Sequence, residues 1–148
     1  DMDGLKLVND NLGHTAGDTL LKTAASLILQ GTRGSDVVAR TGGDEFTLLL
    51  MNCPENAANR ILERIRAVID IHNATSGVMP VFISFGLVCA HEKNRSVNRL
   101  VSQADKNMMD VKVKNHPHHL AIIRQWIEKQ LGTGIDMADP RLTHVQKG

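Results

Sequence analysis

Apolar residues recur at helical spacing from the first third of the chain onward. In residues 17–30 they fall on one face of a helix, which predicts an amphipathic helix. Asp18 lies near its start, where a carboxylate suits a helix N-terminus. The apolar positions are Leu20, Leu21, Ala24, Leu27 and Ile28.

Two further segments show the same spacing. Residues 54–75 open with Pro54, which favours the first position of a helix, and then repeat apolar side chains on one face. Residues 96–114 follow the same pattern and begin with Ser96, a residue type that caps helix N-termini. We expect a helix in each segment.

Between the helices lie β-rich runs. Residues 36–41 and 44–51 are separated by Gly42 and Gly43, which predicts a hairpin with a two-residue turn. Residues 81–90 are apolar and β-branched and predict a buried strand. The order helix, hairpin, helix, strand, helix predicts an α/β (α+β) sandwich with an antiparallel sheet.

The pattern changes after Pro117. Residues 118–131 predict one more amphipathic helix, whereas residues 132–148 contain Gly and Pro and few apolar anchors. We therefore expect a domain over residues 1–116, followed by an appended helix and loose tail over residues 117–148.

Composition narrows the class of protein. The chain has 148 residues and 42% hydrophobic content, enough for the core of one domain. A net charge of +1 and 3% aromatic residues argue against coating nucleic acid or stacking on single strands. Cys53 and Cys89 are too few for a disulfide framework, and no long apolar run or signal pattern occurs. We expect a soluble, cytoplasmic chain without membrane contact.

Carboxylates flank the predicted turn and open the chain. Asp44 and Glu45 follow the two glycines, and Asp1 and Asp3 come first in the sequence. A glycine pair alone only indicates a turn. Acidic groups at two strand ends, however, suit Mg²⁺, which takes one or two carboxylates together with water and substrate phosphates. A nucleoside triphosphate would complete that shell.

These residues carry a resemblance to a known family. TGGDEF at residues 41–46, with DMDGLKLVNDNLGHTAGD at residues 1–18, resembles the signature of GGDEF domains, the diguanylate cyclases, and the likeness extends over residues 1–115. It implies a ferredoxin-like, nucleotidyl-cyclase palm-type antiparallel sheet flanked by helices. It also implies that two GTP molecules are condensed into cyclic di-GMP.

The resemblance implies two Mg²⁺ (or Mn²⁺) ions per active site, held by Asp1, Asp44 and the Met2 carbonyl. Catalytic roles then fall to Glu45, Asp44 and Lys6, with Glu45 as base or electrostatic partner for the attacking hydroxyl. The alternative for Glu45 is a solvated carboxylate at a strand end.

Substrate contacts follow in the same way. Gly42 and Gly43 would let the backbone approach the phosphates, and Lys6 and Lys112 would hold the triphosphate. The resemblance places Asn9 and Asp18 at the guanine, where a carboxylate can accept from N1 and N2. Asp18 could equally be only a helix cap.

Arg33 and Asp36 form an RxxD pattern that resembles the product-binding inhibitory site of the family, and Arg64 resembles an arginine that completes it. The planar guanidinium of arginine can donate paired hydrogen bonds to guanine and to phosphate. We expect non-competitive inhibition by cyclic di-GMP at this site.

The chain departs from the family pattern in two places. His116 stands where a phosphate-contacting arginine is usual, and His118 and His119 beside it are expected in a solvated linker rather than a metal site. The helix and first strand that precede Asp1 in the family are absent, so the fold is expected to be N-terminally truncated. An α-amino charge at Asp1 would oppose Mg²⁺.

The function predicted from this reasoning is a diguanylate cyclase that works as a homodimer with one GTP on each domain, inside a parent protein with an upstream sensory or receiver domain. Two alternatives stay open: a catalytically silent domain that senses GTP or cyclic di-GMP, and a dimerisation module. The activity of this truncated chain by itself is a separate question.

Overall fold

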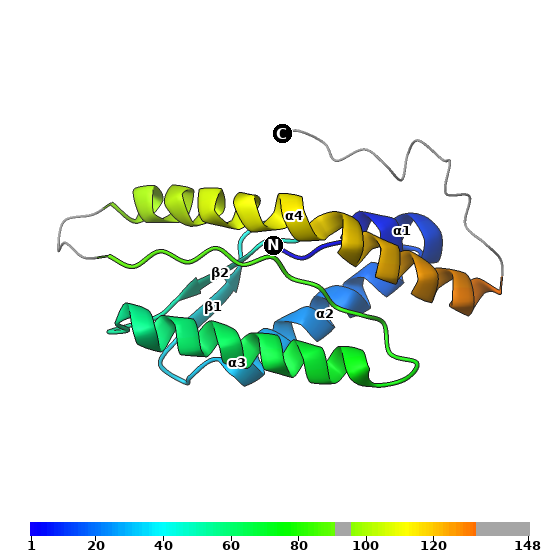
Figure 1. The fold of residues 1–148 in the computed structure, drawn as a ribbon, viewed down its shortest axis with the longest axis horizontal. Coiled ribbons are helices and arrows are strands. Elements are labelled where there is room, and N and C mark those ends of the chain that lie inside the picture. Colours follow the sequence, from blue (N-terminus) through cyan, green and yellow to red (C-terminus); the bar gives the residue numbers. More distant parts are fainter. Residues whose placement is uncertain (91–95, 133–148) are drawn as a thin grey trace.

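The computed structural model describes residues 1–90 and 96–132. Helices and a small antiparallel sheet make up the fold (Figure 1), which confirms the predicted α+β class. The elements in chain order are α1 (Leu5–Leu12), α2 (His14–Gly31), β1 (Val37–Arg40), β2 (Phe46–Leu49), α3 (Glu55–Ala74) and α4 (Val97–Leu131).

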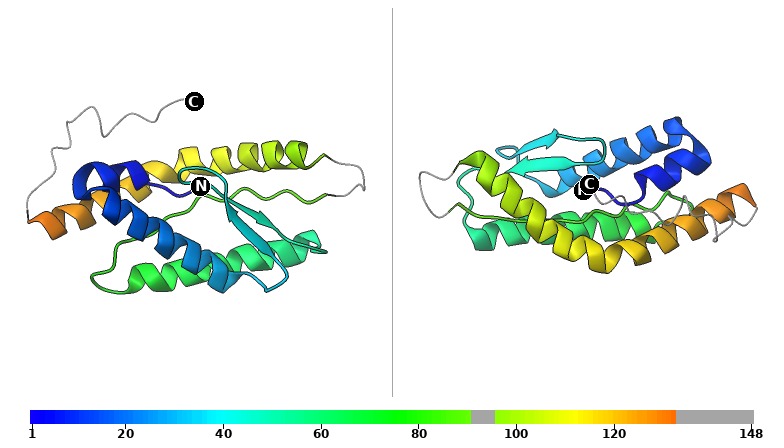
Figure 2. Two further views of the ribbon diagram at one scale, coloured as in Figure 1. Left: turned by 180° about the vertical axis from the view of Figure 1, so that it is seen from behind. Right: turned by 90° about the horizontal axis from the view of Figure 1, so that it is seen from above.

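The chain is arranged around the extended segment 81–90. In Figure 1 this segment runs between α3 and α4, and in the view from above in Figure 2 helix α4 begins beside the β-hairpin and runs diagonally away from it. The buried apolar residues come from the chain start, all four helices and the start of this segment. Those with the lowest exposure are Met2, Val8, Leu20, Ala24, Ile28, Ile65, Val81, Ile123 and Ile127.

The predicted helices over residues 17–30 and 54–75 are confirmed as α2 and α3, which bury their apolar faces against each other. Pro54 lies one position earlier than predicted, because it is the N-cap residue and not the first helical residue. Helix α1 was not predicted from the sequence. It has only eight residues and lies between Gly4 and Gly13, both with φ of 83°, a backbone conformation that glycine adopts freely.

The β-hairpin forms as predicted, but its turn differs. Strands β1 and β2 pair from Val37 with Leu49 to Arg40 with Phe46, so residues 41–45 form the loop. The two-residue turn predicted at Gly42 and Gly43 is therefore wrong. Such turns need positive φ at one or both central residues, and neither glycine has it.

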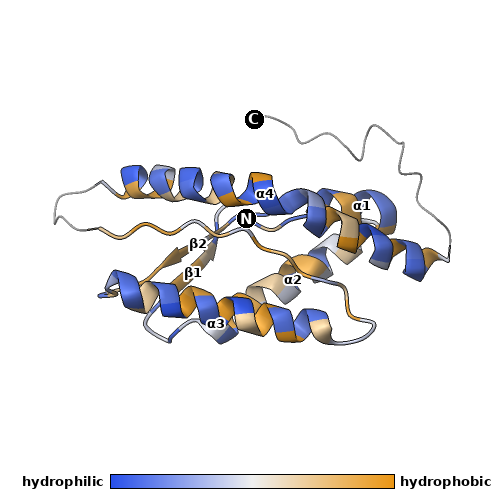
Figure 3. Cartoon of the chain, viewed as in Figure 1, coloured by the Kyte–Doolittle hydropathy of each residue, from blue (hydrophilic) through white to orange (hydrophobic). Residues whose placement is uncertain are grey.

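The predicted buried strand over residues 81–90 is also wrong as a strand. The segment is extended and apolar (Figure 3), but within the described residues its only ladder contact is an isolated bridge between Ile83 and Met2. Apolar composition predicts burial, whereas a strand also needs a neighbouring strand that accepts its backbone hydrogen bonds.

Helix α4 is a single helix of 35 residues that continues through Pro117, where two helices separated by a linker were expected. One proline removes a single backbone donor, and here the packing of the following turns maintains the helix. Ile123 and Ile127 have 0% exposure in the same core as α1 to α3. The helix therefore crosses the predicted domain boundary at residue 117.

The predicted tail falls mainly on residues 133–148, which lie outside the described part. None of the helices that the structure describes is both long and apolar enough to span a membrane.

Candidate functional site

The first three residues lie between the hairpin loop and the extended segment. The Met2 N–H donates to the Asp44 carbonyl oxygen at 2.9 Å, and the Asp3 N–H donates to the Phe82 carbonyl oxygen at 2.9 Å. The Ser84 N–H donates to the Asp1 carbonyl oxygen at 2.8 Å. Backbone hydrogen bonds thus bring Asp1 and Asp44 together, although they are far apart in sequence.

Helix α4 supplies the charge opposite Asp1. The Lys112 ammonium lies 2.5 Å from a carboxylate oxygen of Asp1, and both side chains are largely buried. The predicted metal ligand Asp1 therefore has a cationic partner on α4.

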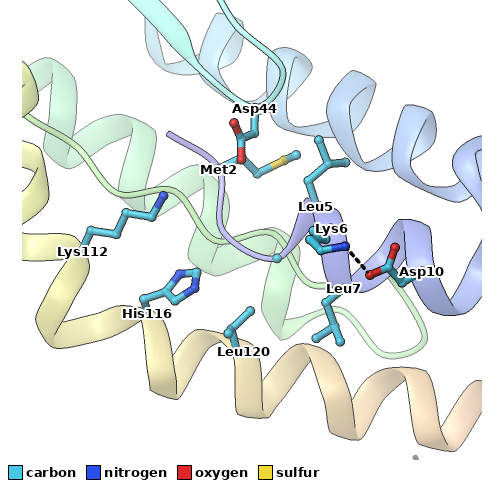
Figure 4. Close-up of a pocket in the computed structure, with 10 residues that line it drawn as sticks. Met2, Leu5, Lys6, Leu7, Asp10, Asp44, Lys112, His116 and Leu120 are labelled. Atoms are coloured by element: carbon cyan, nitrogen blue, oxygen red, sulfur yellow. Dashed lines mark hydrogen bonds and ion pairs between the residues drawn. The ribbon is translucent and has the colours of Figure 1, made fainter. Parts of the chain in front are cut away.

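A cavity of about 120 Å³ opens beside this cluster (Figure 4). Lys112, His116 and Leu120 reach it from α4, Asp44 from the hairpin loop, and the remaining residues from the chain start and α1. The lining residues are Met2, Gly4, Leu5, Lys6, Leu7, Asp10, Asp44, Lys112, His116 and Leu120. Basic and acidic side chains on an otherwise apolar wall can bind a phosphate together with a cation.

Lys6 lies at this cavity but pairs with Asp10 at 2.8 Å, one turn further along α1 (Figure 4). The Lys6 side chain is 74% exposed. Its predicted role toward a triphosphate therefore requires it to leave Asp10, and an exposed helix pair of this kind is worth only about 0.3–0.5 kcal/mol.

The hairpin loop packs Glu45 over Gly42. A Cβ at Gly42 would lie 2.5 Å from a carboxylate oxygen of Glu45, so a larger residue at this position would require the Glu45 side chain to move. The Arg40 guanidinium donates to the carbonyl oxygens of Gly42 and Gly43, the latter at 2.8 Å from Nη2. No role was predicted for Arg40 from the sequence, although it stands only two residues before Gly42.

The predicted guanine contacts lie on the α1 and α2 pair. Asn9 Oδ1 is buried and accepts no hydrogen bond from the described residues, and a Cβ at Gly17 would lie 1.9 Å from it. Asp18 follows Gly17 and is exposed. The two helices thus bring Asn9 close to the turn of α2 that carries Asp18.

The RxxD residues bind each other. Arg33 donates to the Asp36 carboxylate from its backbone N–H at 2.8 Å and from Nη2 at 2.9 Å. Hydrogen bonds from the Arg33 side chain lower the pKa of Asp36, and the charge of Arg64 acts in the same direction. Arg64 itself donates from Nε to the Gly31 carbonyl oxygen at 2.6 Å. The three residues of the predicted product site therefore lie in one region, at the end of α2 beside α3.

The residues around Asp1 fit a divalent cation of the predicted kind. In the described part of the chain, no three His, Cys, Asp or Glu side chains are arranged to hold a metal ion by themselves. Mg²⁺ does not require a site built of protein side chains alone, because one or two carboxylates, water and substrate phosphates complete its coordination shell. Lys112 already places a positive charge on Asp1. Asp1, Asp44 and the Met2 carbonyl are the groups that could hold the ion.

The linker predicted around His116 is wrong. His116 and His119 lie on α4, and each donates from Nδ1 to the carboxylate of Asp3, at 2.8 Å and 2.7 Å. His118 between them is exposed. Asp3 and His119 were not among the predicted site residues, because no local spacing relates two residues 116 positions apart.

Comparison with known proteins identifies the family. The family model for "Diguanylate cyclase, GGDEF domain" matches residues 1–117, so the chain belongs to the GGDEF family. It is 47% identical over 107 residues to the probable diguanylate cyclase DgcE of Escherichia coli, covering 71% of this chain and 10% of that protein. It is 35% identical over 114 residues to diguanylate cyclase A of Treponema denticola, covering 76% of this chain and 31% of that protein. The chain spans less than a third of the length of either relative.

Solved structures agree with this assignment. The crystal structure of the GGDEF domain of YfiN (TpbB) from Pseudomonas aeruginosa superposes with a TM-score of 0.67 at 35% identity, covering 77% of this chain and 73% of that chain. The diguanylate cyclase SiaD of the same species, solved in complex with its activator SiaC, gives a TM-score of 0.68 at 33% identity, covering 77% of this chain and 44% of that chain. These matches confirm the predicted fold class.

Proposed function

We propose that the chain is the catalytic domain of a diguanylate cyclase, which condenses two GTP into one cyclic di-GMP and two pyrophosphates. The observation that carries the proposal is the convergence of Asp1 and Asp44 beside a cavity that Lys112 lines from α4. The match to the GGDEF family supports this proposal, and two carboxylates beside a lysine suit a cation that binds together with a nucleotide phosphate.

In each half of the reaction, the 3′-hydroxyl oxygen of one GTP forms a bond to the α-phosphorus of the other, and the bond from that phosphorus to pyrophosphate breaks. Glu45, exposed at the end of the hairpin loop, accepts the hydroxyl proton or stabilises the hydroxyl as it loses that proton. Divalent ions, when bound by Asp1, Asp44 and the Met2 carbonyl, supply charge neutralisation for the attacking and leaving oxygens.

The residues of α1 and α4 bind and orient the substrate in this proposal. Lys112 and Lys6 hold the triphosphate after leaving Asp1 and Asp10, their partners in the free chain. Asn9 and Asp18 bind the guanine edge. Gly42 and Gly43 allow the loop backbone to approach the phosphates.

Each domain carries one GTP, so two domains must meet in twofold symmetry before the phosphorus and the hydroxyl come within bonding distance. The rate should therefore rise more than linearly with protein concentration. Arg33, Asp36 and Arg64 form a second, separate site at which cyclic di-GMP inhibits the enzyme.

The test is incubation of the chain, and of its full-length parent, with GTP and Mg²⁺, followed by chromatographic detection of cyclic di-GMP. Asp44→Asn and Glu45→Gln should abolish product while the circular dichroism spectrum stays unchanged. Asp70→Asn, which removes an exposed carboxylate from α3, is the matched control and should behave as the parent. Product formed by Asp44→Asn at the parental rate would contradict the proposal.

A further inference from the structure

Asp3 is a buried carboxylate beside the proposed metal ligands. It is 1% exposed, and both of its oxygens accept hydrogen bonds. His116 Nδ1 donates to one oxygen at 2.8 Å, while His119 Nδ1 at 2.7 Å and Ser84 Oγ at 3.2 Å donate to the other. A carboxylate removed from water is costly unless donors replace its hydration, so these three groups make this position possible.

His119 is fixed in its own position by an aromatic contact. Its ring stacks on Phe82 with 4.4 Å between centroids and 11° between planes. Phe82 also accepts the Asp3 N–H at its carbonyl oxygen. Phe82 therefore binds the Asp3 backbone directly and, through its stack on His119, also positions a side-chain partner of Asp3.

One face of α4 contacts both carboxylates at the chain start. Lys112, His116 and His119 are spaced by four and three residues, which places them on one side of a helix. Lys112 binds Asp1, and the two histidines bind Asp3. Movement of this helix face would therefore shift both acidic residues and Met2 between them.

His119 lies beyond residue 117, where the family match ends. It is on the part of α4 that Ile123 and Ile127 anchor in the core. The GGDEF motif and the family match over residues 1–117 do not include His119.

We propose that His119, supported by His116, is a positioning residue for the metal-binding segment: its Nδ1 hydrogen bond to Asp3 fixes Asp1 and the Met2 carbonyl in the geometry that a divalent ion needs. This rests on the proposed function for the identity of the ligands. His119 touches neither substrate nor metal in this role. It acts through Asp3, as residues behind metal ligands commonly do.

The test separates the hydrogen bond from the ring stack in the full 148-residue chain. His119→Phe keeps an aromatic ring over Phe82 and removes the donor, whereas His119→Asn keeps a donor near the Nδ1 position and removes the ring. His118→Phe alters the exposed neighbouring histidine and is the matched control. Mn²⁺ affinity is measured by titration calorimetry, and exchange of the Met2 and Asp3 amide hydrogens by NMR.

We expect His119→Phe to weaken Mn²⁺ binding about tenfold and to speed exchange of the Met2 and Asp3 amides relative to those of α2. His119→Asn should recover most of the affinity, and His118→Phe should match the unaltered chain. A merely structural role would change global stability without this difference between the Phe and Asn variants.

The inference is overturned if His119→Phe binds Mn²⁺ as the unaltered chain does, if the Asn variant is no better than the Phe variant, or if the unaltered chain binds no Mn²⁺. Failure of the proposed function looks different. In that case Mn²⁺ binds and responds to His119→Phe, but no cyclic di-GMP is formed.

Discussion

The ammonium of Lys112 lies beside Asp1, where the proposed function requires a divalent cation. At 2.5 Å it forms a short, largely buried ion pair with a proposed metal ligand. In the proposed site, the Lys112 ammonium would repel a divalent ion on the same carboxylate, so we expect Lys112 to oppose metal binding until a triphosphate offers it another partner. Such an exchange would link metal binding to substrate binding.

Lys112→Met should therefore have opposite effects on two ligands. Mn²⁺ affinity without nucleotide should rise about tenfold, since a like charge is removed from the site, whereas GTP affinity should fall. Calorimetric titration of each ligand measures both, and Lys114→Met, an exposed lysine on the same helix, is the control. Unchanged or weaker Mn²⁺ binding would show that Lys112 does not compete.

A second prediction at the residue scale concerns the stability of the fold at low pH. Because Arg33 donates hydrogen bonds to Asp36, the pKa of Asp36 in the folded chain lies below its ordinary value of 3.8. The pair therefore stabilises the fold above that ordinary value, and the contribution disappears as the pH falls through the lowered pKa. Arg33→Met should return the pKa of Asp36 toward 3.8 and flatten the pH dependence of unfolding in this range.

Carbon-13 NMR titration of the Asp36 carboxyl group measures the shift directly. The same variant should bind cyclic di-GMP about tenfold more weakly or worse, since charged hydrogen bonds to the product are lost. Arg99→Met on α4 serves as the control. Parental affinity in Arg33→Met would refute the product site while leaving the cyclase proposal intact.

At the scale of elements, the second half of α4 belongs to the core. Ile127 has 0% exposure, and a Cβ at Gly4 would lie 2.4 Å from the Cδ1 atom of Ile123. The start of the chain and the end of α4 therefore pack closely. This contact explains why the helix continues through Pro117, since ending it there would expose both isoleucines.

Ile127→Ala should lower the free energy of unfolding by about 2–5 kcal/mol, the usual cost of removing a buried isoleucine side chain. Leu131→Ala, at a position that is 45% exposed, should change it by less than about 0.5 kcal/mol. Urea denaturation followed by circular dichroism measures both. If residues 118–131 were an independent appendage, both variants would leave the free energy of unfolding of the remaining fold unchanged.

At the scale of the whole molecule, the proposed site is built where three distant parts of the chain meet. The chain start provides Asp1 and Asp3, the hairpin loop provides Asp44, and α4 provides Lys112 and the histidines. The same arrangement joins the proposed metal ligands to a helix that extends past the family match. A signal that moved this helix would reach the ligands directly.

Part of the proposed site was predicted from the sequence. The resemblance carried by the GGDEF motif and the opening DMD pointed to Asp1, Asp44 and Glu45, and the structure brings the backbone beside Asp1 to that of Asp44. The spacing of Arg33 and Asp36 identified a pair that does form. These features lie within short stretches, where sequence neighbours are also neighbours in space.

The sequence by itself determined the amphipathic helices α2 and α3 and the existence of the hairpin, since apolar periodicity and turn residues act over a few positions. Tertiary structure alone decided that residues 81–90 are extended without a ladder, that α4 is continuous, and that Asp3 binds His116 and His119. These outcomes depend on which surfaces are available to bury a side chain or pair a backbone. The Asp3 contacts join residues more than a hundred positions apart, and no local pattern records such a choice.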